Sequence, residues 1–121
     1  MVEINSEITK VLQARADATK SDARVKKLKN QGIDTPSEMC IDVVRNMYRM
    51  SRGYCAATGV KFVCESHHPK MFSLDRINPN KGYTIDNVWL VTDSYNKGKS
   101  RQTVEEYDLL IQEMANEYSY C

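Results

Sequence analysis

The chain has 121 residues and a mass of 13.9 kDa, which suffices for one domain of ordinary size and not for two. Its composition, 41% hydrophobic and 27% charged, is that of a folded protein, and no stretch approaches the roughly 18 consecutive apolar residues of a membrane span. The first residues also lack the apolar run of a signal peptide, so we expect a cytoplasmic protein without a membrane partner.

The net charge of +1 conceals an uneven distribution. Residues 1–101 carry all 17 basic side chains and 11 acidic ones, whereas residues 102–121 carry five acidic side chains and neither lysine nor arginine. The near-neutral total therefore does not exclude a nucleic-acid partner. The basic run 20–29 is typical of a solvated helix face and equally of a surface that contacts phosphates.

Three segments are predicted to be helical. Residues 4–29 carry apolar side chains at helical spacing and contain neither glycine nor proline. In the next segment Thr35 is a capping residue, Pro36 stands at the first helical position and Glu38 completes a capping box, which predicts a helix that Gly53 ends. Residues 103–118 repeat the helical pattern. We therefore divide the chain into an N-terminal region of two helices (1–53), a central unit (54–101) and an acidic C-terminal helix (102–121).

The central unit has the pattern of a strand, a polar loop, a second strand and a helix. Residues 71–77 and 87–91 are the β-type runs, residues 78–83 are dense in turn formers, and Thr92 or Asp93 caps a helix that continues to Lys99. The predicted fold is α+β, a mainly helical single domain with a central ββα unit. A carboxylate on the first strand, Asp75, and an amide on the helix, Asn96, are then either ligands for a hard divalent cation or ordinary cap and turn residues.

A longer motif covers the same region. It consists of CAATGV at 55–60, SLDRINPNKGYTIDNVWLV at 73–91 and YNKGKS at 95–100. These residues resemble the HNH (ββα-metal) endonuclease family, and most closely the small HNH proteins of phages and mobile elements. The resemblance implies a DNA endonuclease that hydrolyses phosphodiesters with one Mg²⁺ or Mn²⁺ ion, by nicking or as a dimer. It implies Asp75 and Asn96 as metal ligands, Asn87 as the residue that fixes the hairpin, and a phage-encoded protein that acts in the host cytoplasm.

The residue after Asp75 departs from the family pattern. Many members have a histidine there as the general base, whereas this chain has Arg76. Because arginine stays protonated, Arg76 cannot act as the base, and its expected role is to bind the phosphate. If residues 68–75 were extended, His68 would lie about 23 Å from Asp75. The base is therefore unassigned. This leaves a second hypothesis, an HNH-fold protein impaired in catalysis that binds DNA or a host protein as an inhibitor or accessory factor.

Two further sets of residues follow from these patterns. Structural zinc is bound by residue types such as those of Cys55, Cys64, His67 and His68. Only Cys64, His67 and His68 lie close together in the sequence, whereas zinc-binding members of the HNH family use two C-x-x-C pairs. We therefore favour free thiols and surface histidines over zinc. The chain is expected to act as a monomer or homodimer, and its expected DNA-contacting residues are Lys20, Arg24, Lys26, Lys27, Lys29, Lys81, Lys97, Lys99 and Arg101.

Overall fold

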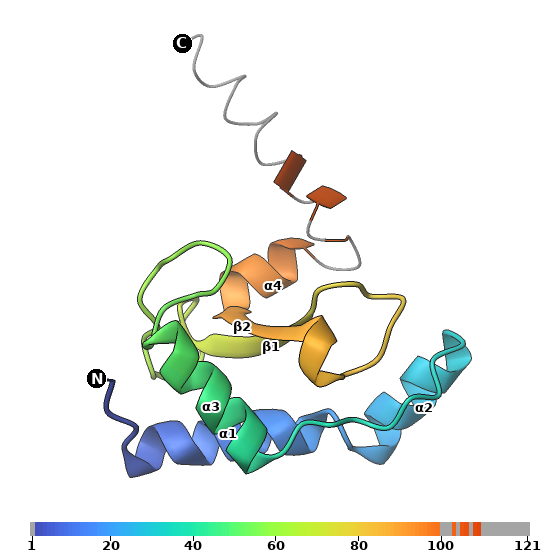
Figure 1. Cartoon of the computed structure of the whole chain (residues 1–121), viewed down its shortest axis with the longest axis horizontal. Coiled ribbons are helices and arrows are strands. Elements are labelled where there is room, and N and C mark those ends of the chain that lie inside the picture. The colour runs from blue at the N-terminus through green and yellow to red at the C-terminus, as the bar shows by residue number, and fades with distance from the viewer. Residues whose placement is uncertain (1, 100–102, 104, 107, 110–121) are drawn as a thin grey trace, which may run out of the picture.

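The computed structural model describes residues 2–99, 103, 105–106 and 108–109, and its architecture is a small α+β domain (Figure 1). No helix among these residues is both long and apolar enough to cross a membrane. The described elements are α1 (Ser6–Ala18), α2 (Asp22–Asn30), α3 (Ile41–Ser51), β1 (Phe72–Arg76), the 3-10 helix η1 (Ile85–Asn87), β2 (Val88–Thr92) and α4 (Asp93–Lys99).

The two strands form an antiparallel sheet in the middle of the domain. Its register places Phe72 opposite Thr92 and Arg76 opposite Val88. Helix α4 covers one side of the sheet, and α1 and α3 cover the other (Figure 1). Four of the five residues of β1 are buried in succession, because helices pack against both of its faces. The strand thus runs through the interior even though the sheet has only two strands.

An aromatic cluster forms the centre of the core. The ring of Phe72, fully buried on β1, meets the rings of Tyr48 and Phe62 edge-on at centroid distances of 5.5 and 5.7 Å. Helix α1 adds Ile8 and Leu12, which lie four residues apart on one face. Phe72, Leu74 and Tyr83 of the hairpin are all buried, whereas Trp89 is only partly buried and packs against the core.

The N-terminal region contains three helices where the sequence predicted two. The predicted helix over 4–29 is divided after Ala18, and a new helix starts at Asp22. The Ser21 side chain accepts a hydrogen bond from the Arg24 amide, and this cap stabilises the new start. Because of the break, α2 does not continue the direction of α1, and its residues lie beside the hairpin (Figure 1).

The predicted capping box at 35–38 is wrong. Helix α3 starts at Ile41, preceded by Cys40, and its start has no side-chain cap. The Glu38 carboxylate instead accepts a hydrogen bond from the Ile85 amide at 2.8 Å, and the Glu38 amide donates to the Tyr83 carbonyl. These polar groups join the segment to the hairpin, so they are not available for a local cap. The predicted end is nearly right, because Arg52 and Gly53 adopt left-handed backbone (φ 57° and 81°) after Ser51.

The central elements follow the predicted order, with small shifts in their bounds. Strand β1 is shorter than the predicted run 71–77, and β2 is shifted by one residue from 87–91 to 88–92. The predicted cap of α4 by Thr92 is confirmed, since its hydroxyl accepts from the Tyr95 amide. Of the predicted helix over 103–118, residues 105–106 and 108–109 are helical, with Thr103 accepting from the Glu106 amide. The rest of that prediction lies outside the described residues.

Candidate functional site

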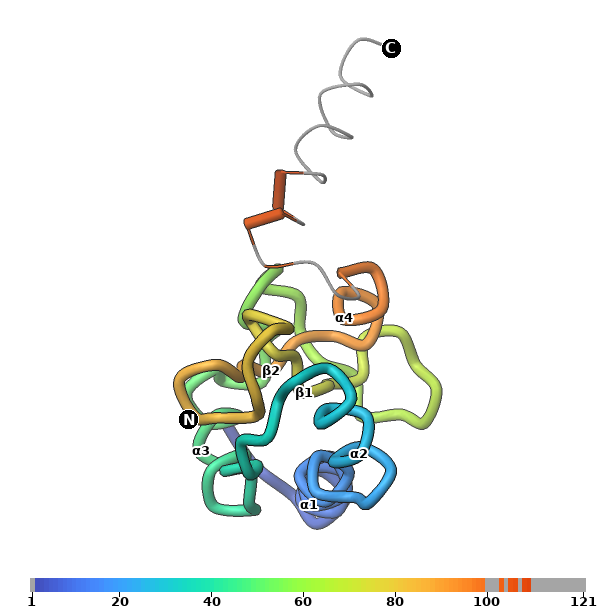
Figure 2. Tube along the Cα trace, turned by 90° about the vertical axis from the view of Figure 1, so that its right-hand side faces the viewer, coloured from blue at the N-terminus to red at the C-terminus, as the bar shows by residue number. Residues whose placement is uncertain are grey.

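A polar cleft with a volume of about 280 Å³ lies along the outer edge of β1. Residues of α1, α2, β1 and α4 line it. Figure 2 shows the backbone of β1 between α1 and α2 on one side and α4 on the other. Four cationic side chains line the cleft together with one carboxylate, that of Asp75. The cations are Arg15, Arg24, Lys27 and Arg76. A cleft with this excess of positive charge attracts anions.

Two arginines join the N-terminal helices to the hairpin. Arg15 on α1 donates from Nε to the Phe72 carbonyl at 3.3 Å, and its Nη2 lies 3.5 Å from Asp93 Oδ2. Arg24 on α2 donates from Nη1 to the Tyr83 hydroxyl at 3.1 Å. These contacts fix the helices against β1 and the loop that follows it. The two guanidinium groups therefore line the cleft as part of the folded structure.

Arg15 was not among the residues predicted to contact phosphates. It lies next to Ala16 and three residues after Leu12, at the flank of the buried stripe of α1. A cation at the flank of an apolar stripe extends toward whatever the helix packs against. The position of Arg15 beside the apolar residues of α1 is therefore the feature of the sequence that indicates this role.

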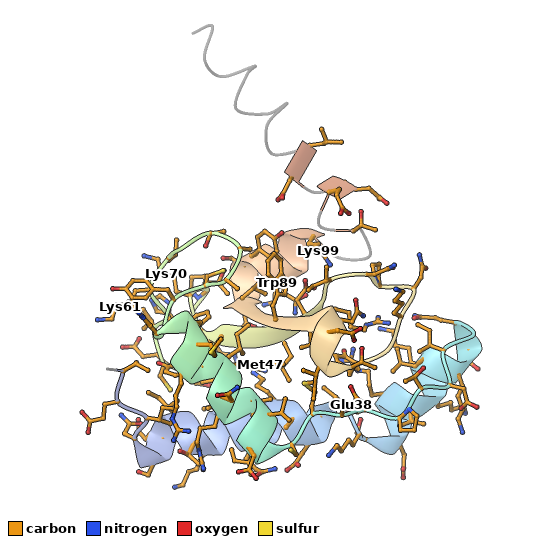
Figure 3. All side chains as sticks on the ribbon, viewed as in Figure 1. Glu38, Met47, Lys61, Lys70, Trp89 and Lys99 are labelled. Carbon is orange, nitrogen blue, oxygen red and sulfur yellow. The ribbon has the colours of Figure 1, made fainter. Side chains whose placement is uncertain are left out.

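The Asp75 carboxylate is buried and bonded on both oxygens. The side chain lies on β1 with only 4% of the residue exposed. The indole Nε1 of Trp89 donates to Oδ2 at 2.9 Å. The ammonium of Lys99 lies 3.1 Å from Oδ2 and 3.2 Å from Oδ1, and also donates to the Arg76 carbonyl at 2.7 Å. Figure 3 shows Trp89 and Lys99 together at the α4 side of the sheet.

The spacing of residues on β1 and α4 explains this arrangement. Ser73 and Asp75 are two residues apart on a strand, so they share one face. Asn96 and Lys99 are three residues apart on a helix, so they also share one face. Asn96 Nδ2 donates to Ser73 Oγ at 2.7 Å, and Lys99 pairs with Asp75. The face of β1 and the face of α4 thus contact each other through two residue pairs.

The structure corrects the predicted role of Lys99. This residue was expected to contact DNA from the surface, but it is fully buried and its ammonium has three acceptor contacts inside the protein. In this conformation it is therefore not a phosphate contact. The neighbouring Lys97 is exposed, as predicted for a DNA-contacting residue, and Arg101 lies outside the described residues.

Asn87 and Arg76 hold the loop between the strands. Asn87 Oδ1 accepts from the Asn78 amide at 2.9 Å, and Nδ2 donates to the carbonyls of Asn78 and Gly82. Arg76 Nη1 donates to the carbonyls of Pro79 and Lys81, and its guanidinium lies over the Tyr83 ring at 5.4 Å. Arg76 thus has a structural role in the loop while it also lines the cleft.

The remaining predicted basic residues of the described chain do not line the cleft. All are exposed, and Lys29 lies 3.9 Å from Asp34. They are Lys20, Lys26, Lys29, Lys81 and Lys97. Of the residues predicted to contact phosphates, Arg24, Lys27 and Arg76 line the cleft, and the exposed lysines named above lie outside it.

The candidate zinc ligands lie in different places. Cys55 is buried beside the α3–β2 surface, whereas Cys64 and His67 line a separate pocket near α1. His68 Nδ1 accepts from the Lys70 amide, and the Met71 amide donates to the His68 carbonyl, so the chain turns at 68–71 and the fully extended path considered for 68–75 is not present. Over the described ranges, no three His, Cys, Asp or Glu side chains form a group that could hold a metal ion.

The two thiols have opposite electrostatic environments. Burial and then the Glu7 carboxylate raise the pKa of Cys64. Burial also acts to raise the pKa of Cys55, but hydrogen bonds from the Thr58 hydroxyl and from backbone amides outweigh it and lower that pKa. The Thr58 hydroxyl therefore contacts the Cys55 thiol.

Asp75 and Asn96 have the donor chemistry that a hard divalent cation requires. Both line the same cleft, and the Asn96 amide is held through Nδ2, so its Oδ1 is the atom suited to a ligand role. The Lys99 ammonium already places a positive charge against the Asp75 carboxylate, so the position suits a cation. A divalent ion bound at Asp75 would have to displace the Lys99 ammonium from the carboxylate, while the Trp89 indole also donates to Oδ2.

Comparisons with protein-family models, with curated proteins and with solved structures gave no match for this chain.

Proposed function

We propose that this protein is a DNA endonuclease of the HNH type that uses one Mg²⁺ or Mn²⁺ ion. The single observation that carries the proposal is that Asp75 and Asn96 line one cleft with four cationic side chains. A phosphodiester in that cleft would be adjacent both to the oxygen ligands and to the positive charge. The motif at 73–91 and 95–100 supports the same assignment from the sequence.

Each cleft residue has a defined part in this function. Arg24 and Lys27, with Arg15 behind them, bind the phosphates that flank the scissile bond and fix the direction of the strand. Asp75 and Asn96 would hold the ion, which would supply electrostatic stabilisation of the negative charge that develops during phosphodiester hydrolysis. Asn87 keeps the loop in place, and Trp89 orients the Asp75 carboxylate.

Proton transfer from the attacking water has no histidine to accept it among the described cleft residues, since neither His67 nor His68 lines the cleft. Arg76 cannot accept a proton because its guanidinium stays charged. A positioned general base typically contributes about 10²–10⁴-fold to a rate. We therefore expect slow turnover that depends mainly on the ion and on phosphate binding.

A second candidate function is favoured by the Lys99–Asp75 ion pair. A carboxylate whose two oxygens are both occupied resembles a site that has lost its ion. The chain would then bind DNA, or a host protein, through the basic cleft and its flanks without cleaving. In that case divalent ions would change neither its affinity nor the integrity of the DNA.

The test is nicking of supercoiled plasmid with Mg²⁺ or Mn²⁺. The wild type is expected to nick, and Asn96→Ala is expected to abolish nicking, while Asn80→Ala, an exposed amide in the loop, serves as the matched control. Asp75→Ala alone leaves Lys99 buried without its carboxylate, which is strongly destabilising. The double variant Asp75→Asn/Lys99→Met removes both buried charges and is the safer knock-out.

DNA affinity in EDTA, measured by fluorescence anisotropy, shows whether the protein binds DNA when no divalent ion is present. Together with the nicking assay it distinguishes the two functions. Nicking that persists in Asn96→Ala and in the Asp75→Asn/Lys99→Met variant contradicts the metal assignment. Intact plasmid under every divalent ion, with DNA binding retained, supports the binding protein instead.

A further inference from the structure

The Lys99 ammonium takes the place that a metal ion would have at Asp75. It is fully buried, it lies 3.1 and 3.2 Å from the two carboxylate oxygens, and it donates to the Arg76 carbonyl at 2.7 Å. Trp89 bonds one of the same oxygens. The pair is electrically neutral, so the buried carboxylate is already compensated by a group of the chain itself.

A divalent ion cannot simply be added to this pair. An ion bound to Asp75 beside the Lys99 ammonium would leave excess positive charge in a buried place, and Arg15, Arg24, Lys27 and Arg76 line the same cleft. Like charges at such distances repel strongly where water is excluded. Without a polyanion, the free protein therefore favours its own ammonium over the ion.

The phosphates of a nucleic acid change this balance. They would bring negative charge into the cleft, which compensates the ion and the surrounding cations together. They would also offer the Lys99 ammonium new acceptors. Lys99 is on the same face of α4 as Asn96, which lines the cleft. Its flexible four-carbon stem would allow the ammonium to turn from Asp75 towards phosphates bound in the cleft.

We propose that Lys99 and the divalent ion compete for Asp75, and that nucleic-acid phosphate in the cleft decides the competition in favour of the ion. This proposal rests on the proposed function and adds a condition to it: the ion binds tightly only together with the nucleic acid. By thermodynamic linkage the coupling is reciprocal, so the ion tightens nucleic-acid binding by the same factor as the nucleic acid tightens ion binding. Lys99 is a positioning residue in this scheme and prevents ion binding to the free protein.

Mn²⁺ binding, measured by the electron paramagnetic resonance signal of free Mn²⁺, tests the proposal without reference to cleavage. Binding is measured with the protein alone and with a short DNA duplex, whose integrity is checked afterwards on a gel. For the wild type we expect the duplex to raise Mn²⁺ affinity by a factor in the range of about 5–150, which is typical of coupled sites. The duplex alone provides the correction for Mn²⁺ bound by DNA itself.

The informative variant is Lys99→Met, which removes the ammonium and fills much of the same volume. We expect it to bind Mn²⁺ without DNA about tenfold or more tightly than the wild type, and we expect the coupling to DNA to shrink towards one. Lys97→Met is the matched control for Mn²⁺ binding measured without DNA, because Lys97 is exposed on the same helix and its substitution removes one positive charge without freeing the Asp75 carboxylate. Thermal melting of each variant confirms that it is folded, and Lys99→Gln replaces Lys99→Met if the latter does not fold.

The outcomes separate this proposal from the function on which it rests. If the wild type binds Mn²⁺ equally tightly with and without DNA, and Lys99→Met matches it, the competition is refuted while the metal-dependent nuclease stands. If neither the wild type with DNA nor Lys99→Met binds Mn²⁺ more tightly than Asp75→Asn/Lys99→Met, the metal site itself is refuted. Equal gains in Lys97→Met and Lys99→Met would show a general charge effect and overturn the specific role of Lys99.

Discussion

Trp89 and Asp75 are directly opposite each other on the two strands, and the indole Nε1 donates to the carboxylate Oδ2 at 2.9 Å. Opposite residues of an antiparallel pair have their side chains on the same face of the sheet. The tryptophan thereby fixes the rotation of a buried carboxylate that Lys99 also contacts. Trp89 is only partly buried, and its ring also meets Tyr95 edge-on. Trp89 therefore packs its ring against the core and also donates a hydrogen bond to the site.

Trp89→Phe is expected to destabilise the protein by about 1.5–3 kcal/mol, the usual contribution of a hydrogen bond to a charged group. The phenyl ring preserves an aromatic side chain beside Tyr95, so the loss reports mainly the missing donor. Urea unfolding followed by circular dichroism measures the change. A free energy of unfolding within 0.5 kcal/mol of the wild type, a limit we set as roughly the effect of a neutral surface substitution, contradicts this role.

Asn87→Ala is expected to release the loop between β1 and β2. The side chain makes three hydrogen bonds to the backbone of Asn78 and Gly82, at about 1 kcal/mol each, so we expect a loss of about 3 kcal/mol. Lys81, exposed in the same loop, becomes a site of early trypsin cleavage. Asn80→Ala is the control, and equal trypsin sensitivity in both variants would count against the role of Asn87.

We expect the cations that line the cleft to contribute more to the salt dependence of DNA binding than those that do not line it. Arg24 and Lys27 line the cleft, whereas Lys26 and Lys29 on the same helix do not. Each duplex phosphate contact contributes about 0.9 to the slope of log K against log salt. The double change Arg24→Ala/Lys27→Ala should therefore lower the slope by about 2, and Lys26→Ala/Lys29→Ala should lower it much less. Fluorescence anisotropy between low and moderate salt gives the slope for each double variant. Identical slopes for the two variants would show that the cleft is not part of the DNA interface.

Tyr48 is expected to limit stability at alkaline pH. Burial, and then the charge of Cys64, raise the pKa of its hydroxyl in the folded protein. A raised folded-state pKa means that the protonated form is favoured by folding, so this contribution is fully present below the unfolded value near 10 and is lost as pH rises through the folded value. Tyr48→Phe lacks this ionisation, and its free energy of unfolding should fall less steeply above pH 10. Tyr54→Phe, at a position that is 45% exposed, should follow the wild type.

Much of the central unit could be predicted from local sequence patterns. The β-type runs, the turn formers at 78–83 and the capping Thr92 are local signals, and the order strand, loop, strand, helix follows them. The positions of Asp75 at the end of a strand and Asn96 on a helix followed from the same signals. The capping box at 35–38 was equally clear and was wrong, because Glu38 bonds Ile85, which is 47 residues away along the chain.

The sequence by itself determined which segments form the hairpin and the helix after it, and which polar residue types those elements carry. Only the tertiary structure decided what those groups contact. The joining of Arg24 to Tyr83 and the burial of Lys99 against Asp75 link residues 59 and 24 positions apart. Periodicity and caps are encoded within a few neighbouring residues, whereas a buried charge pairs with whichever group the packed elements bring within reach. For this reason the surface lysine predicted at position 99 is a buried cation next to the carboxylate of the candidate site.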